Sequence, residues 1–135
     1  IEIKGRNKKP LGGWDKRKEN AEVNSEFDAK HFMDIIRYQS ETKKVEDGNI
    51  LADRVMNEPV ISEVIANKKG DTWVVEIKRP LKSSQSGNIN LALDQTYNFG
   101  FAIHDDYSNG RFHHVSLGYK LGFDDSNAEI NAVKQ

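Results

Sequence analysis

The sequence contains no cysteine among its 135 residues. Without cysteine these residues cannot form a disulfide, a zinc–thiolate site, an iron–sulfur cluster or a CxxCH haem attachment. Proline is scarce, at 3 residues, and no apolar run is long enough to span a membrane. The 20 Lys and Arg residues nearly balance the 21 Asp and Glu residues. This balance argues against a general nucleic-acid or membrane-surface binder.

Catalytic motifs are missing as well. There is no GxSxG nucleophile elbow, no cysteine nucleophile, and no Walker or dinucleotide glycine pattern. The acidic residues are numerous but do not single out a glycosidase-type carboxylate pair. The sequence therefore predicts a protein that is not an enzyme acting alone.

The chain length suits one domain with two less regular ends. Residues 1–30 form a basic, poorly periodic arm, residues 31–125 carry the periodic segments, and residues 126–135 form a polar tail that could fray or form a short helix. The chain begins with Ile1 rather than Met, so we expect that it was processed or cut from a longer polypeptide.

The first half of the periodic region predicts strands. Residues 31–39 are rich in β-branched and aromatic side chains, and as a strand they place His31 and Met33 on one face. Asp47-Gly48 predicts a hairpin turn, followed by a second strand within residues 50–56. Residues 60–66 suit either a strand or a helical turn.

The second half is more regular. Residues 72–79 alternate in hydrophobicity between a turn at residues 68–71 and Pro80, which removes a hydrogen-bond donor. Further strands are predicted at residues 89–93, 96–104 and 112–123, with turn-forming residues between them. Strands at this spacing predict an all-β fold, an antiparallel β-sandwich.

Histidine is concentrated in this half. Three of the four histidines, His104, His113 and His114, lie within eleven residues. Imidazole is a common metal ligand and titrates near neutral pH, so such a cluster requires an explanation. Either the histidines bind a metal or haem, or they are ordinary strand residues.

Three motifs occur in order along this part of the chain. They are W-x-V-x-x-x-R-P-L at residues 73–81, Y-x-F-G-x-A-I-H-D at 97–105, and H-H-V-S with a later L-G at 113–122. Together they resemble the haem-binding domain family shared by the γ subunit of ethylbenzene dehydrogenase and related cytochromes. The resemblance implies a β-sandwich that holds one non-covalent, b-type haem with Met and Lys as axial ligands. It also implies electron transfer outside the bacterial cytoplasmic membrane, and hence a periplasmic location.

The ligands implied by this resemblance are only partly present. Where the family has its ligating Lys, this chain has a histidine pair, and counting back from Val115 favours His113 over His114. Strand alternation also places His113 with the apolar residues Val115 and Leu117. No methionine occupies the position of the family's ligating Met. His31 and Met33 are therefore the candidates for the second axial ligand, although Met33 could equally be ordinary core.

Five further residues are predicted to contact the haem: Trp73, Arg79, Phe101, Arg111 and Phe112. The two arginines could pair with haem propionates through bidentate hydrogen bonds. Trp73 could instead be a core residue, and each arginine an ordinary surface side chain. His104 precedes two aspartates and is more simply explained as a turn residue.

Two functions remain open. The first is a haem-binding electron-transfer module that serves a redox partner protein or another subunit of an oxidoreductase. The second is a carbohydrate-binding type of β-sandwich, with stacking faces from Trp14, Trp73, Tyr97, Tyr107 and Tyr119. A calcium ion in the acidic loop at residues 105–110 could stiffen that module. The histidine pair is required by the first function and superfluous to the second.

Overall fold

The computed structural model describes residues 3–4, 10–12, 18–104 and 113–134. Within these residues the secondary structure is β1 (Ile3–Lys4), β2 (Pro10–Gly12), α1 (Asn20–Asp28), β3 (Met33–Gln39), β4 (Lys44–Ile50), β5 (Arg54–Met56), β6 (Glu63–Lys69), β7 (Thr72–Lys78), β8 (Tyr97–Phe99), β9 (Ala102–His104), β10 (His113–Val115), β11 (Tyr119–Phe123) and β12 (Ile130–Ala132). The predicted all-β class is confirmed. The chain divides into two compact units, Ile1–Ile89 and Asn90–Gln135.

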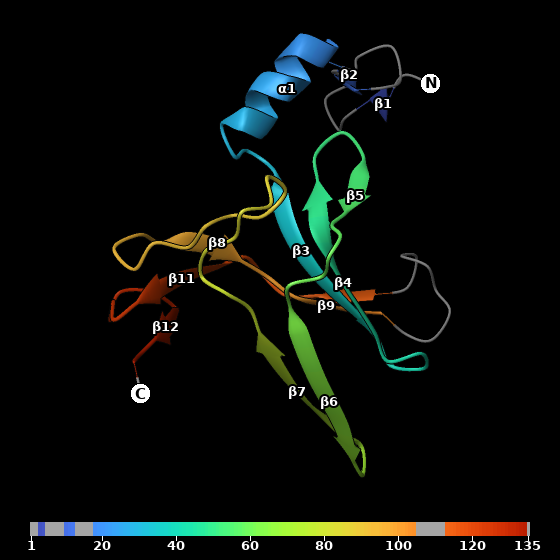
Figure 1. The fold of residues 1–135 in the computed structure, drawn as a ribbon, viewed down its shortest axis with the longest axis vertical. Coiled ribbons are helices and arrows are strands. Elements are labelled where there is room, and N and C mark those ends of the chain that lie inside the picture. The colour runs from blue at the N-terminus through green and yellow to red at the C-terminus, as the bar shows by residue number, and fades with distance from the viewer. Residues whose placement is uncertain (1–2, 5–9, 13–17, 105–112, 135) are drawn as a thin grey trace. The chain divides into compact units, whose positions relative to one another are not determined.

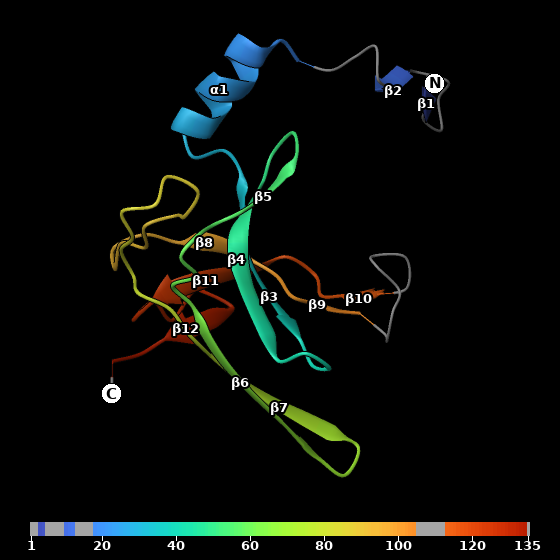
Figure 2. The same cartoon turned by 45° about the vertical axis from the view of Figure 1, so that its right-hand side comes forward.

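The first unit contains a three-stranded antiparallel sheet in the order β3-β4-β5. Strands β3 and β4 pair along their whole length, from Met33 opposite Ile50 to Gln39 opposite Lys44. Figures 1 and 2 show this sheet in cyan and green, with the β6–β7 hairpin as a separate ribbon of two long strands. The short β1–β2 pair precedes helix α1.

The predicted turn at Asp47-Gly48 was wrong, because both residues lie in the middle of β4. The side chain of Asp47 is fully buried, and its Oδ2 accepts hydrogen bonds from the backbone N–H groups of Ile61 (2.8 Å) and Ser62 (3.1 Å). At Gly48 an added Cβ would lie 2.1 Å from the carbonyl oxygen of Val55 on β5. The two residues thus serve strand packing, and the chain turns earlier, at residues 40–43.

The β6–β7 hairpin confirms the alternation read from the sequence. Its register runs from Glu63 opposite Lys78 to Lys69 opposite Thr72. Gly70 occupies the turn with φ 59°, a left-handed conformation that glycine adopts without steric cost. Residues 60–66, for which strand and helical turn both stayed open, contribute to β6.

Helix α1 was not predicted, because the sequence carries no hydrophobic periodicity that would indicate it. None of its residues is buried, so it has no apolar stripe to give the 3.6-residue period. It is attached through Phe27, whose ring stacks on that of Phe32 at 5.0 Å, and Lys30 Nζ lies 5.6 Å from both ring centroids. Phe32 is the one buried hydrophobic residue among those that the structure describes.

The second unit contains a three-stranded sheet in the order β12-β11-β8 and the pair β9–β10. The predicted strands at 96–104 and 112–123 each divide into two shorter strands with different partners. Residues 89–93 form no strand, and the polar tail forms β12, which pairs in parallel with β11. The arrangement of these sheets as a sandwich stays a prediction.

Candidate functional site

The candidate ligand histidines lie on the β9–β10 pair of the second unit. In its antiparallel register His113 stands opposite His104, His114 opposite Ile103, and Val115 opposite Ala102. His104, which the sequence suggested as a turn residue, is therefore the cross-strand neighbour of the principal candidate. Sequence reasoning missed this pairing because a register between segments nine residues apart depends on the intervening chain.

Exposed apolar side chains lie on both faces of this strand pair and next to it. Ile103 and Val115 each keep 62% of their surface exposed, and Leu117 keeps 79%. Phe101, a predicted haem contact, is 54% exposed. Such a concentration of uncovered apolar side chains on a short hairpin is typical of a binding surface.

Ser116 holds the backbone of Phe101, the first of these exposed apolar residues, through two hydrogen bonds. Its hydroxyl accepts a hydrogen bond from the N–H of Phe101 at 2.9 Å, and its own N–H donates to the carbonyl of Phe101 at 2.8 Å. Phe101 therefore has its backbone held while its ring stays uncovered. The residue just before it, Gly100, interrupts the predicted long strand and separates β8 from β9.

The two candidates for the second axial ligand belong to the first unit. Met33 begins β3 opposite Ile50 and is 62% exposed. His31 lies before β3, so the prediction that both residues share one strand face was wrong. Its Nδ1 lies 2.7 Å from Oε2 of Glu26 on α1. This hydrogen bond with His31 is the largest cause that lowers the pKa of Glu26.

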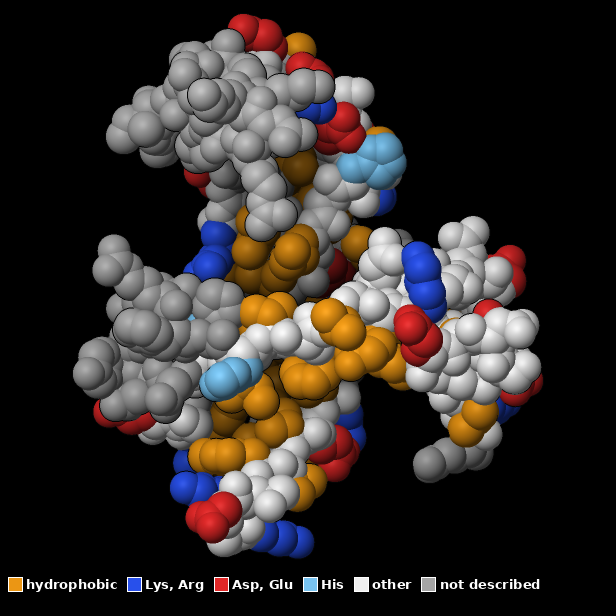
Figure 3. Space-filling view, turned by 180° about the vertical axis from the view of Figure 1, so that it is seen from behind, with side chains coloured by type: hydrophobic (Ala, Val, Ile, Leu, Met, Phe, Trp, Pro, Cys, Tyr) orange, Lys and Arg blue, Asp and Glu red, His pale blue; other side chains and the backbone are white. Residues whose placement is uncertain are grey.

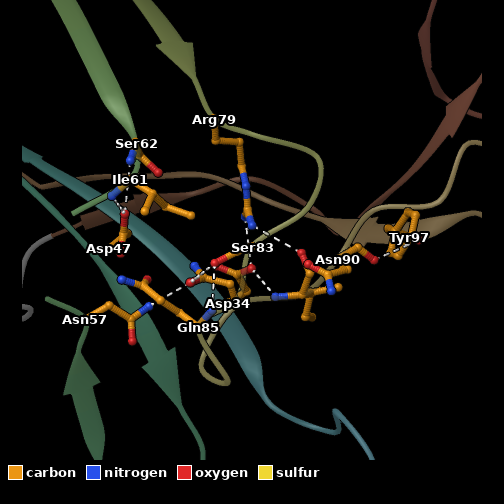
Figure 4. Close-up of polar contacts among 12 residues, drawn as sticks. Asp34, Asp47, Asn57, Ile61, Ser62, Arg79, Ser83, Gln85, Asn90 and Tyr97 are labelled. Atoms are coloured by element: carbon orange, nitrogen blue, oxygen red, sulfur yellow. Dashed lines mark hydrogen bonds and ion pairs between the residues drawn. The ribbon is translucent and has the colours of Figure 1, made fainter. Parts of the chain in front are cut away.

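Arg79, a predicted propionate partner, has structural contacts in this unit. Its Nη1 donates to Oδ2 of Asp34 at 2.9 Å and its Nη2 to the carbonyl of Ile89 at 3.2 Å. The N–H of Ile89 donates to the same Asp34 oxygen at 2.7 Å. Figure 4 shows Arg79 reaching from the end of β7 to Asp34 on β3. The structure thus accounts for this arginine without a haem, and its role toward propionates stays a prediction.

Trp73 lies on β7 with 49% of its surface exposed, so it is not the core residue that one reading of the sequence suggested. Arg111, Phe112, the acidic loop at 105–110 and the side chain of His113 lie outside what the structure describes. Among the described residues no group of three or more His, Cys, Asp or Glu side chains is placed to hold a metal ion.

The described tyrosines do not favour the carbohydrate-binding alternative. The ring of Tyr97 packs edge-on against Phe123 at 6.4 Å, and its hydroxyl accepts the N–H of Ala92 at 2.7 Å. Tyr119 is partly buried in β11. Trp14 and Tyr107 lie outside the described residues. A row of open aromatic rings, which sugar stacking needs, is thus not formed by the tyrosines on β8 and β11.

The fold and these surfaces define a β-domain with nitrogen donors among exposed apolar side chains. A profile of the ethylbenzene dehydrogenase family matches residues 4–116, which include both histidines of β10. The chain belongs to this family, as the three ordered motifs predicted.

Two cytochromes are similar to the chain. Cytochrome c-552 of Stutzerimonas stutzeri is 41% identical over 105 residues, which cover 77% of this chain and 35% of that protein. Cytochrome c-551 of Rhodocyclus tenuis is 35% identical over 77 residues, which cover 57% of this chain and 30% of that protein. The chain thus spans about a third of the length of each relative. No solved structure is significantly similar to it.

In the part of the chain that the structure describes, no helix combines the length and the apolar character needed to cross a membrane.

Proposed function

We propose that this chain binds one haem non-covalently and serves as an electron-transfer domain. The proposal is carried by one observation: the family match includes β10, where histidines stand in register with a strand that carries exposed apolar residues. An imidazole donor beside apolar surface fits a haem, which needs an axial ligand and a low-polarity environment. The two similar proteins are both cytochromes by name.

The absence of cysteine limits how these residues could hold the haem. Both relatives are named as c-type cytochromes, but the sequence of this chain has no cysteine to form thioether bonds. Axial coordination and apolar contacts would therefore hold the haem in this chain, as in a b-type centre. Extraction with acid and acetone should release it from the protein.

The register limits the choice of axial ligands. Directly opposed residues of an antiparallel pair have Cα atoms only about 4.5–5.5 Å apart. Two such residues cannot reach the two opposite faces of one flat macrocycle, so His104 and His113 do not form the axial pair. We therefore propose one ligand on β10, with His113 preferred over His114. Met33 and His31 stay the candidates for the second ligand that the sequence suggests.

When bound, the haem would supply the one-electron redox couple. The residues of the chain would provide the axial donors, exclude water with apolar side chains such as Val115 on the His113 face of β10, and hold the strand through Ser116. The electron would pass to or from a partner protein or another subunit of an oxidoreductase. A periplasmic location is part of the same proposal.

Visible spectra of three histidine variants test the ligand. His113→Ala should lose haem or change it to a high-spin spectrum, because a protein nitrogen ligand is removed. His104→Ala, altered at the opposed position, should leave the low-spin spectrum nearly unchanged. If His114→Ala has the larger effect, the ligand is on the other face of β10. A wild-type protein without a Soret band after haem addition would refute the function itself.

A further inference from the structure

The buried side chains of the first unit are mostly polar. Phe32 is the one buried hydrophobic residue among those that the structure describes, whereas five polar or charged residues are buried: Glu46, Asp47, Asn49, Ser62 and Asn88. Hydrophobic side chains are instead common on the surface, as Figure 3 shows in orange. Because a buried polar group needs a hydrogen-bond partner or an ion, each unpartnered atom in this interior requires an explanation.

Three buried acceptor oxygens of the described residues have no hydrogen-bond partner. They are Oδ1 of Asp34, Oδ1 of Asp47 and Oε1 of Gln85, and the donor Nε of Arg79 is unpartnered as well. Asp47 is fully buried, and the side chain of Asp34 is only 8% exposed. Arg79 pairs with Asp34 at 2.9 Å, but no cation among the described residues pairs with Asp47. A fully buried carboxylate without a positive partner is costly, so the charge of Asp47 favours binding of a cation.

The register of the β3–β4 pair places the two carboxylates on one face of the sheet. Asp34 stands opposite Asn49, and Asp47 lies two residues before Asn49 on β4, so the three side chains share a face. Asp34 and Asp47 are therefore diagonal neighbours, and such residues are about 7–8 Å apart. Two aspartate side chains can span this distance with bonds of about 2.3–2.6 Å to a shared Ca²⁺.

The segment that follows β7 closes this face of the sheet. At Gly87 an added Cβ would lie 2.4 Å from Nδ2 of Asn49 and 2.8 Å from Oδ1 of Asn57. Nδ2 of Asn57 donates to Oδ1 of Asn88 at 3.1 Å, and Asn88 is only 2% exposed. The segment thus lies directly on the sheet, and the layer between them holds amide groups beside the two carboxylates.

We propose that this layer binds one Ca²⁺ ion, with Oδ1 of Asp34 and Oδ1 of Asp47 as its charged ligands. Ca²⁺ takes 6–8 oxygen ligands from carboxylates, amides, main-chain carbonyls and water, and the unpartnered Oε1 of Gln85 is a further donor of this kind. Two carboxylates completed by neutral oxygens differ from a group of three or more His, Cys, Asp or Glu ligands, of which the described residues form none. The ion would join β3 and β4 within the first unit, and it does not depend on haem.

Thermal unfolding of chelator-treated full-length chain tests whether calcium binds. At a calcium concentration about 100-fold above the dissociation constant, the midpoint should rise by roughly 5–10 °C. Mg²⁺ at the same concentration should give a smaller rise, because it requires shorter bonds and a near-ideal octahedron. Equal midpoints with and without calcium would overturn the proposal, and water would then be the partner of the unpaired oxygens.

Matched variants test where the ion binds. Asp47→Asn keeps the shape of the side chain and an acceptor for its two N–H donors but removes a charged ligand, so the calcium-induced rise should be lost. Asp71→Asn, in the exposed β6–β7 turn, and Asp105→Asn/Asp106→Asn, in the acidic loop, should keep the full rise. Each rise is measured from the calcium-free midpoint of the same variant, so a general loss of stability does not count. A rise that only the Asp105→Asn/Asp106→Asn variant loses would overturn the site.

Hydrogen exchange of the wild type provides a test that does not depend on how a variant folds. The N–H groups of Ile61 and Ser62 donate to Asp47, and that of Ile89 donates to Asp34. Calcium should slow the exchange of these three amides by roughly 10–100-fold, because it stabilises the carboxylates that hold them. The amides of the turn at residues 69–71 should exchange at an unchanged rate. Slowing that is confined to residues 105–110 would overturn the proposal.

Discussion

The buried carboxylate of Asp47 leads to a quantitative prediction about stability. Its Oδ2 accepts two backbone N–H groups, and no part of its side chain is exposed. Hydrogen bonds to a charged acceptor contribute about 1.5–3 kcal/mol each, so Asp47→Ala loses roughly 4 kcal/mol. The other oxygen, Oδ1, has no hydrogen-bond partner among the described residues, and removing it returns about 1–2 kcal/mol. The expected net loss is about 2–3 kcal/mol.

Equilibrium urea unfolding, followed by tryptophan fluorescence, measures this loss. With a slope of about 2 kcal/mol per molar urea, the midpoint of Asp47→Ala should fall by roughly 1–1.5 M. Asp47→Asn keeps an acceptor oxygen and should lie between the two proteins. Asp71→Ala, in the exposed β6–β7 turn, should shift the midpoint by less than about 0.3 M. Equal midpoints for Asp47→Ala and Asp71→Ala would refute the reasoning.

Two further predictions concern β4. The Lys44 ammonium, 2.6 Å from Glu46, is the largest cause that lowers the pKa of this carboxyl from its usual 4.5. When the pKa of a carboxyl is lower in the folded state than in the unfolded state, the ionised carboxylate stabilises the fold at pH above the unfolded-state pKa. This stabilisation is lost as pH falls through the folded-state pKa. Glu46→Gln should therefore be less stable than wild type at pH 7. The difference in thermal midpoint should shrink as pH falls below 4.5 and vanish once pH is below the lowered folded-state pKa; a constant difference would contradict this. Gly48→Ala should separate β5 from β4, because its Cβ would overlap the carbonyl of Val55. Hydrogen exchange should reveal the opened pair, whereas Gly118→Ala, which has open space, should match the wild type.

The hairpins could be predicted to different extents, for physical reasons. In β6–β7 an apolar face alternates with a mixed face, and a glycine in the turn marks the reversal, so both strands were found. In β4 the same kind of local signal gave a wrong prediction of a turn, because the pair Asp47-Gly48 is also typical of hairpin turns. Only the fold shows that the aspartate accepts distant N–H groups and that the glycine makes room for Val55.

The candidate site was predicted through ordered motifs rather than through periodicity. Alternation within residues 112–117 could suggest that His113 shares a face with Val115. It could not indicate that His104 stands opposite, because cross-strand register is a long-range property. Likewise the ion pair of Arg79 with Asp34 joins residues 45 positions apart, and a local sequence pattern carries no signal for it.

The β6–β7 pair has a further consequence for the apoprotein. Within the described residues it is a two-stranded sheet, so the outer side of each strand keeps backbone N–H and C=O groups that no neighbouring strand satisfies. Open edges of this kind can recruit strands from other molecules, and the row Trp73–Ile77 adds β-branched side chains that favour stacking. Lysines near the turn, Lys68 and Lys69, oppose such association by charge repulsion. The chain thus balances the apolar character of the hairpin against aggregation with two cations at its tip.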